Sequence, residues 1–117
     1  MPIATEIRFN KARRVLEVAF DDGTHFAYPA EYLRVESPSA EVQGHSPSQK
    51  QIVPGRRHVG ITAIEPVGNY AVRLVFDDLH DTGIFSWEYL HELGCEQDRR
   101  WQAYLAALDA RGLRREP

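Results

Sequence analysis

The sequence predicts a small α+β domain of two related units, each made of antiparallel strands and ending in a short helix, followed by an amphipathic C-terminal helix. The first observation behind this prediction is a repeat. Residues 18–22 (VAFDD) precede the triplet EYL at 31–33, and residues 72–78 (VRLVFDD) precede the same triplet at 88–90. The other two observations are an alternation of apolar and polar residues around both DD pairs and a helical periodicity near the C-terminus.

Length and composition indicate a single globular domain that spans residues 1–117. The chain has 43% hydrophobic and 26% charged residues, which is ordinary for a folded domain. Within it we expect a first unit at residues 3–35, a loop at 36–58, a second unit at 59–94 and a C-terminal helix at 96–111.

Charge and cysteine content argue against several classes of protein. The formal net charge of −3 disfavours a nucleic-acid binder that relies on bulk positive charge. No apolar stretch is long enough to cross a bilayer and no basic-then-apolar leader is present, so we expect no membrane partner. Cys95 is the single cysteine, which permits no internal disulfide and no all-cysteine zinc site. Together these features favour a cytoplasmic protein.

Alternating apolar residues predict three strands in each unit. In the first unit the alternating residues are Ile7, Phe9, Leu16, Val18, Phe20, Phe26 and Tyr28. In the second unit Val72, Leu74 and Phe76 match the stripe formed by Leu16, Val18 and Phe20.

Residues with strong local preferences predict the turns and helix ends. Asp22-Gly23 favours a tight hairpin turn in which both residues take a positive φ. Pro29 is expected to be the first residue of the first unit's helix, where its missing N–H costs nothing. In the second unit Ser86 is expected to cap the helix at its start, and Gly94 to end it in the left-handed conformation.

The last helix has the clearest pattern. Its apolar residues recur at helical spacing and predict a face that packs on the sheets: Trp101, Tyr104, Leu105 and Leu108. Gly112 is expected to stop this helix, and we expect the tail at 114–117 to be frayed.

Residues 36–58 differ in kind from the rest of the chain. They contain three prolines, two glycines and four serines, which oppose a long helix or strand. Such a loop is either a mobile connector or a functional segment, and the sequence leaves both open. We expect Val42, Ile52 and Val53 to attach it to the body of the domain. Its candidate interaction residues are Glu41, His45, Arg56 and Arg57.

His80 is the most informative histidine, since imidazole is a common metal ligand. It lies in the turn where the second unit is longer, beside Asp77, Asp78 and Asp81. These side chains could attract a divalent cation, or the aspartates could simply cap backbone N–H groups.

A metal centre formed by His80, His45 and Glu41 is one alternative function. It needs a helical turn between Glu41 and His45, which Gly44 and Pro47 oppose. An anion site at Arg56 and Arg57, with Lys50 nearby, is another.

Catalytic motifs are absent from the sequence, so we expect no catalytic residue and, more generally, no enzyme. No serine lies in a Gly-x-Ser-x-Gly elbow, and no glycine pattern follows a strand as a phosphate loop requires. Glu92, Glu96 and Asp98 surround Cys95 and would oppose its thiolate.

Several motifs resemble those of the gamma-butyrobetaine hydroxylase-like N-terminal domain family, which includes stand-alone bacterial domains of unknown function. They are Leu33-Arg34 before SPSAEV at 37–42, Gly44-His45, GNYAV at 68–72 and DTGIFSWEYL at 81–90. The resemblance implies a small α+β domain. It also implies a link to iron or iron–sulfur proteins, because related domains precede iron(II)/2-oxoglutarate hydroxylases or are attached to iron–sulfur carrier ATPases.

The same resemblance implies that a zinc site has been lost. Family members in the hydroxylases hold a structural zinc through three cysteines and a histidine. Here the cysteine positions fall on Ser37, Ser39 and Val42, and only His80 matches a ligand. We therefore expect no zinc or other cofactor, and we expect His80 to lie beside the 36–45 segment and hydrogen-bond a serine or carboxylate there.

Taken together, the sequence favours a non-catalytic accessory or protein-interaction module that works with iron or iron–sulfur proteins through a protein partner. Its functional surface would be the 36–58 loop with His80. The metal-dependent and anion-binding alternatives stay open.

Overall fold

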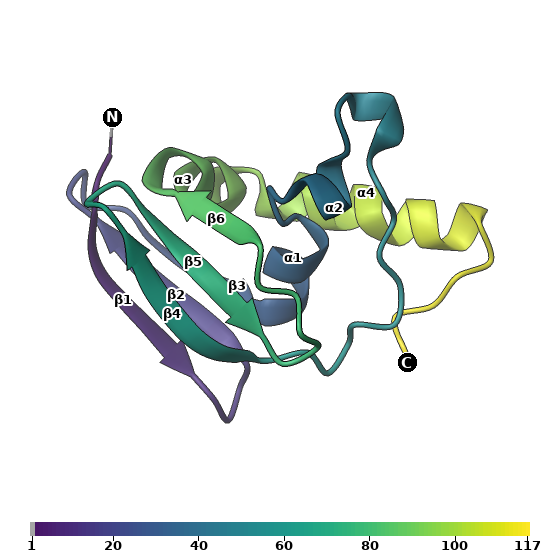
Figure 1. Ribbon diagram of the computed structural model, residues 1–117, viewed down its shortest axis with the longest axis horizontal. Helices are drawn as coiled ribbons and strands as arrows, with labels where there is room; N and C mark the ends of the chain where they lie inside the picture. Colours follow the sequence, from purple (N-terminus) through teal and green to yellow (C-terminus); the bar gives the residue numbers. More distant parts are fainter. Residues whose placement is uncertain (1) are drawn as a thin grey trace.

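The computed structural model describes residues 2–117 and contains two three-stranded antiparallel sheets and four α-helices (Figure 1). The predicted α+β class, with two strand units and a C-terminal helix, is confirmed. In this part of the chain no helix has the length and apolar character needed to cross a membrane.

The two units contain the same elements in the same order. The first comprises β1 (Ala4–Asn10), β2 (Val15–Phe20), β3 (His25–Pro29) and α1 (Ala30–Val35). The second comprises β4 (Ile61–Val67), β5 (Ala71–Phe76), β6 (Gly83–Ser86) and α3 (Trp87–Cys95). The connection carries α2 (Ala40–Gln43) and the 3₁₀ turn η1 (Pro47–Gln49), and the chain ends with α4 (Gln97–Ala110).

Matching backbone hydrogen bonds show that the repeat in the sequence is also a repeat in space. The N–H of Phe20 donates to the carbonyl of Thr24 over 2.9 Å, and the N–H of Phe76 donates to the carbonyl of His80 over 3.0 Å. Val18 pairs with Phe26 across the first hairpin, whereas Leu74 pairs with Gly83 across the second. The second unit's additional residue therefore lies between His80 and Gly83.

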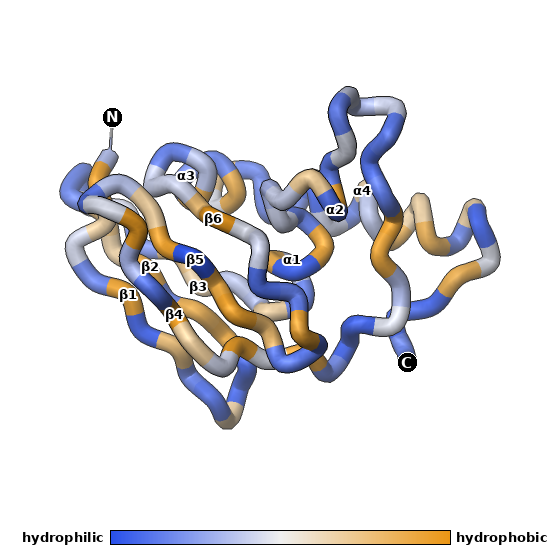
Figure 2. Tube along the Cα trace, viewed as in Figure 1, coloured by the Kyte–Doolittle hydropathy of each residue, from blue (hydrophilic) through white to orange (hydrophobic). Residues whose placement is uncertain are grey.

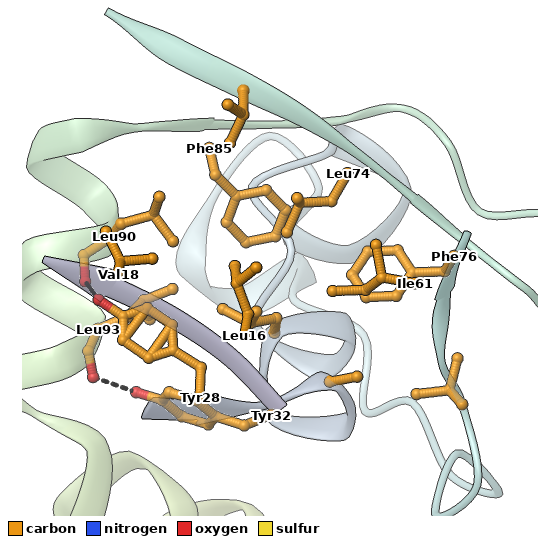
Figure 3. Close-up of a cluster of buried hydrophobic side chains, with 14 of the residues drawn as sticks. Leu16, Val18, Tyr28, Tyr32, Ile61, Leu74, Phe76, Phe85, Leu90 and Leu93 are labelled. Carbon is orange, nitrogen blue, oxygen red and sulfur yellow. Dashed lines mark hydrogen bonds between the residues drawn. The ribbon is translucent and has the colours of Figure 1, made fainter. Parts of the chain in front are cut away.

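The inner faces of the two sheets and the helices enclose one hydrophobic core (Figure 3). The predicted stripes form its centre, with Leu16, Val18, Leu74 and Phe76 at most 1% exposed. Figure 2 shows hydrophobic residues along β2 and β5 and hydrophilic residues on the segment that projects beyond α2. A smaller cluster under α4 consists of Val35, Tyr104 and Leu108, with Ile52, Val53, Trp101 and Leu105 against it.

Tyrosines of the two EYL triplets join the units reciprocally. The Tyr32 hydroxyl donates to the carbonyl of Leu93 over 2.7 Å, and the Tyr89 hydroxyl donates to the carbonyl of Glu36 over 2.6 Å. Each acceptor lies four residues after the tyrosine of its own unit. Because the last carbonyls of a helix have no partner within that helix, each tyrosine completes the helix end of the opposite unit. Tyr28 adds a third hydrogen bond between the units, to the carbonyl of Leu90 in the interior of α3 over 2.6 Å (Figure 3).

Helix α3 does not end at Gly94, contrary to the expectation from sequence. The helix continues to Cys95, and Gly94 lies within it. A Cβ atom at this position would stand 2.4 Å from Cγ of Phe26. The glycine is therefore required by the close approach of β3 to the helix rather than by a left-handed cap.

Two further local predictions are corrected. Pro29 is the last residue of β3 and the N-cap of α1 rather than its first helical residue. In the first hairpin only Gly23 of the predicted pair has a positive φ, at 87°, while the Asp22 carboxylate accepts the N–H of Thr24 over 3.0 Å. The Asp22 side chain therefore stabilises the turn by an Asx-type hydrogen bond.

The C-terminal tail is held in place, so the expectation that it is frayed was wrong. The N–H of Gly55 donates to the carbonyl of Arg114 over 2.9 Å, and the N–H of Arg57 donates to that of Arg115 over 3.0 Å. A local pattern could not reveal these bonds because they join residues far apart in the chain.

Replacing each of the two reciprocal tyrosines tests how strongly they hold the units together. Tyr32→Phe and Tyr89→Phe should each lower the free energy of unfolding by about 1–3 kcal/mol, because each leaves a helix-end carbonyl unsatisfied. Tyr70→Phe is the control, since Tyr70 is 58% exposed and should change little. Urea denaturation measures the differences, and unchanged stability in both variants would mean that water satisfies these carbonyls.

Candidate functional site

A polar cluster joins the segment after α1 to the turn between β5 and β6. Ser37 follows the end of α1, and Ser39 is the N-cap of α2, where its hydroxyl accepts the N–H of Glu41. His80 and Thr82 stand in the turn that is longer in the second unit. Short helices on one side and a hairpin on the other thus position five side chains.

The structure brings His80 and both serine positions together. Ser37 Oγ lies 2.9 Å from His80 Nε2, and Ser39 Oγ lies 2.7 Å from Thr82 Oγ1. Thr82 also donates to Glu41 Oε1 over 3.1 Å. The hydrogen bond expected between His80 and a serine of the 36–45 segment is therefore present.

The interior of this cluster is closed. Ser37 has no exposed surface and His80 is 4% exposed. A Cβ atom on Gly83 would stand 2.5 Å from the Ser37 hydroxyl, so only glycine lets the β6 backbone pass this close. Ser37, His80 and Glu41 resemble a catalytic triad in composition, but a substrate has no route to the buried Ser37 hydroxyl.

Burial lowers the pKa of His80, and the nearby Arg34 guanidinium lowers it further, although Glu41 and Asp78 act in the opposite direction. Nδ1 of the ring lies 3.3 Å from Glu41 Oε2 but is buried without a well-aligned hydrogen bond. Burial and Arg34 therefore favour the neutral form of the imidazole, whose Nε2 lies 2.9 Å from Ser37 Oγ.

The residues at the positions where the resemblance implies zinc ligands do not fit zinc. Two serine hydroxyls and the 2%-exposed side chain of Val42 replace thiolates, and the hydroxyls are already bonded to His80 and Thr82. Between residues 2 and 117 no three His, Cys, Asp or Glu side chains are arranged to hold a metal ion. His45 stands on the exposed side of the connection, where its N–H bonds to the Gln49 side chain, so the triad His80, His45 and Glu41 does not assemble.

Arginines occupy the acidic turn around His80. Asp78 Oδ2 accepts from Arg34 Nε over 2.7 Å and from Arg56 Nε over 2.6 Å, while its Oδ1 accepts the N–H of His80. Burial tends to raise the pKa of Asp78, but the hydrogen bonds from Arg34 and from the His80 backbone outweigh it and keep the pKa low. Asp78 is thus a capping and ion-pairing residue.

Both arginines of the proposed anion site already have partners. Besides Asp78, Arg56 bonds to the carbonyl of Pro54 over 2.9 Å. Arg57 forms an ion pair with Glu116 over 2.7 Å. An anion would have to displace these contacts.

Sequence reasoning missed two residues of this cluster, Arg34 and Thr82. It also missed a separate contact outside the cluster, in which Asp22 lies 2.9 Å from His91, whose other ring nitrogen is 3.7 Å from Cys95. The DTG motif was a usable signal for Thr82. No local pattern marked Arg34 or Asp22, because their partners lie more than forty residues away.

Comparison with known proteins assigns the chain to a family. A sequence model described as gamma-butyrobetaine hydroxylase-like, N-terminal, matches residues 7–91. The chain belongs to this family. The match ends within α3, so α4 and the tail lie outside it.

Solved structures of related proteins share the fold. Two solution NMR structures, 44% and 48% identical, give TM-scores of 0.86 and 0.87 over all of this chain and 92% and 87% of theirs. A crystal structure of a DUF971-family protein of unknown function from Acidithiobacillus ferrooxidans is 45% identical, with a TM-score of 0.66 over 78% of this chain and 91% of that one. No curated protein matches at a significant level.

The lowered pKa of His80 predicts a loss of stability in acid. Above the unfolded-state pKa of 6.5 both states hold neutral imidazole; below it the unfolded chain binds the proton first, so the free energy of unfolding falls until the folded-state pKa is reached. His80→Gln should make this fall shallower. Urea denaturation between pH 5 and 8, about the range in which histidine titrates, measures it. Equal slopes for both proteins would contradict the assignment.

Restoring cysteines at the family positions should create a zinc site. The change Ser37→Cys/Ser39→Cys/Val42→Cys would put cysteines at the three positions where the resemblance implies thiolate ligands, with His80 as the fourth ligand, and zinc should then raise the melting temperature. Adding His80→Ala should weaken zinc binding, because the tetrahedron loses a ligand. Metal analysis of the purified proteins is the measurement. Stoichiometric zinc in the wild type, or indifference to His80→Ala, would contradict the lost-site interpretation.

Proposed function

We propose that this domain is a non-catalytic accessory and protein-interaction module that works in the cytoplasm beside iron or iron–sulfur proteins. The observation that carries the proposal is a projecting loop, defined as residues 44–51, that stands out from the body of the domain (Figure 1). Five consecutive residues of this loop, from His45 to Gln49, are exposed. Loops that a rigid scaffold presents in this way commonly carry binding residues.

The projecting loop is fixed at its base. The N–H of Gln51 donates to the carbonyl of Val42 over 2.6 Å, which closes the loop. Lys50 forms an ion pair with the 4%-exposed Glu36 over 2.8 Å. Gly44 turns the chain with a φ of 67°, and the 3₁₀ turn η1 orders the tip. A loop held in this way loses less conformational entropy on binding than a disordered one.

The buried polar cluster also supports the role as an interaction module, because it fixes the segment that leads to the projecting loop. Ser37 and Ser39 bind side chains of the second unit, so they set the direction in which the connection leaves α1. We assign His80 a positioning role in this arrangement. The resemblance to domains that accompany iron enzymes and iron–sulfur carriers supports the choice of partner.

A metal-binding function is the second candidate. The observation that favours it is the 3.3 Å separation between His80 Nδ1 and Glu41 Oε2, which places two potential ligands side by side. Metal analysis of the purified protein distinguishes the candidates, since a stoichiometric metal that is lost in both His80→Ala and Glu41→Ala would favour metal binding. Anion binding is the weakest of the three proposals, because Arg56 and Arg57 already form ion pairs with carboxylates of the chain.

Site-specific photo-crosslinking tests the interaction module. A photoreactive residue at Ser48, at the tip of the projecting loop, should crosslink to one defined protein in cells. The same residue at Lys11, which is exposed on the β1–β2 turn, is the matched control and should not. Mass spectrometry identifies the partner, and calorimetry with the purified pair should show binding that weakens about tenfold or more in Gln49→Ala and His45→Ala. Equal crosslinking from both positions, or a partner without iron, would overturn the proposal.

A further inference from the structure

The C-terminal tail binds the domain as a short peptide would. After α4 it accepts two main-chain hydrogen bonds, from the N–H groups of Gly55 and Arg57, and it contacts the body through the partly buried side chain of Arg115 and the exposed side chain of Glu116. The other residues between 111 and 117 are exposed. One anchoring side chain and a few main-chain bonds are typical of proteins that recognise extended peptides.

Arg115 occupies a site built for a guanidinium group. Its Nε and Nη2 donate to the two carboxylate oxygens of Glu31 over 2.9 and 2.7 Å. Its guanidinium also lies 5.1 Å from the centre of the Trp101 ring, within cation–π range. We call Glu31, Trp101 and the N–H groups of Gly55 and Arg57 the arginine socket.

Glu31 makes this socket selective. It is 5% exposed, and Arg115 is its sole ion-pair partner among residues 2–117. A buried carboxylate without a cation is costly, so the socket needs a positive group. Arginine satisfies both oxygens at once, whereas lysine offers a single point charge and stacks less well on an aromatic ring.

Helix α4 does not need the end of the tail for its own capping. The N–H of Leu113 donates to the carbonyl of Leu108 over 2.9 Å, and the N–H of Gly112 donates to that of Asp109 over 3.2 Å. Together with the φ of 65° at Gly112, these bonds form a Schellman cap. Residues 114–117 can therefore leave the socket while the helix stays closed.

We propose that the arginine socket is a docking surface for an arginine-bearing segment of a partner protein, and that the tail fills it in cis. Arg57 binds Glu116 directly after Arg115, so the preferred segment carries an acidic residue next to the arginine.

The socket goes beyond the interaction surface proposed above. The projecting loop and the C-terminus lie at different places on the molecule (Figure 1), and none of the socket residues belongs to 44–51. The tail also lies outside the span matched by the family. Because the tail is tethered, it competes at a high effective concentration, so a partner must bind tightly or be tethered itself.

A peptide with the sequence of residues 113–117, Leu-Arg-Arg-Glu-Pro, tests the socket in trans. Full-length Arg115→Ala, which empties the socket, should bind the labelled peptide at least about tenfold more tightly than the wild type, since charge-assisted hydrogen bonds are worth this much. Arg114→Ala is the matched control, because only the main chain of Arg114 contacts the body, and it should behave as the wild type. Fluorescence anisotropy of the peptide gives the affinities.

Two changes test selectivity. A peptide with lysine in place of its second arginine should bind Arg115→Ala about tenfold more weakly, and Arg115→Ala/Glu31→Gln should lose binding. Circular dichroism checks the fold of each protein; if Arg115→Ala is unfolded, Arg115→Lys, which keeps the charge and weakens the tail, takes its place.

Three binding results would overturn the proposal. They are equal affinity for the arginine and lysine peptides, equal affinity of the wild type and Arg115→Ala, and absence of binding to a folded Arg115→Ala protein. Wild-type dimers that the peptide dissociates would also overturn it, because the occupant would then be the tail of a second copy. The projecting loop takes no part in this experiment, so its result is independent of the crosslinking test.

Discussion

The pair of reciprocal hydrogen bonds made by the hydroxyl groups of Tyr32 and Tyr89 is the interaction on which the union of the two units depends. Each tyrosine donates to the carbonyl four residues beyond the other, so each unit supplies what the opposite helix end lacks. A three-stranded sheet with a short helix is too small to bury a core alone. The two units therefore form one core. The repeat is visible in the matching backbone hydrogen bonds of the two hairpins.

The repeat is broken where the candidate site lies. Gly23 in the first hairpin corresponds to Leu79 in the second. Leu79 keeps a positive φ of 73°, and its side chain is 89% exposed. A left-handed leucine costs about 1–2 kcal/mol compared with a relaxed conformation. The next position changes from Thr24 to His80, whose ring fills the space beneath the segment that leaves α1. The asymmetry of the two units thus coincides with a place where the connection is bonded to the second unit.

Local patterns predicted the parts of the structure that local forces determine. Alternation located the strands, and the N-cap at Ser86 was recognised because its hydroxyl binds the N–H of Tyr89 within one turn. Gly94 was misinterpreted, because its reason is the Phe26 ring, 68 positions away in sequence. The tail was missed for the same cause, since Arg115 finds Glu31 at a separation of 84 residues. Resemblance to a family, rather than pattern, put His80 beside the 36–45 segment.

Buried carboxylates attach the elements that the two units do not share. The connection and α4 reach Glu36 through Lys50 and Arg100, and the tail reaches Glu31 through Arg115. Such pairs contribute little net stability compared with apolar packing, yet losing one partner is costly because a buried charge is left behind. A buried carboxylate of this kind selects a cationic side chain, and the apolar core does not change when one such side chain replaces another. Glu31, which binds the chain's own Arg115, would therefore also accept an arginine from another protein.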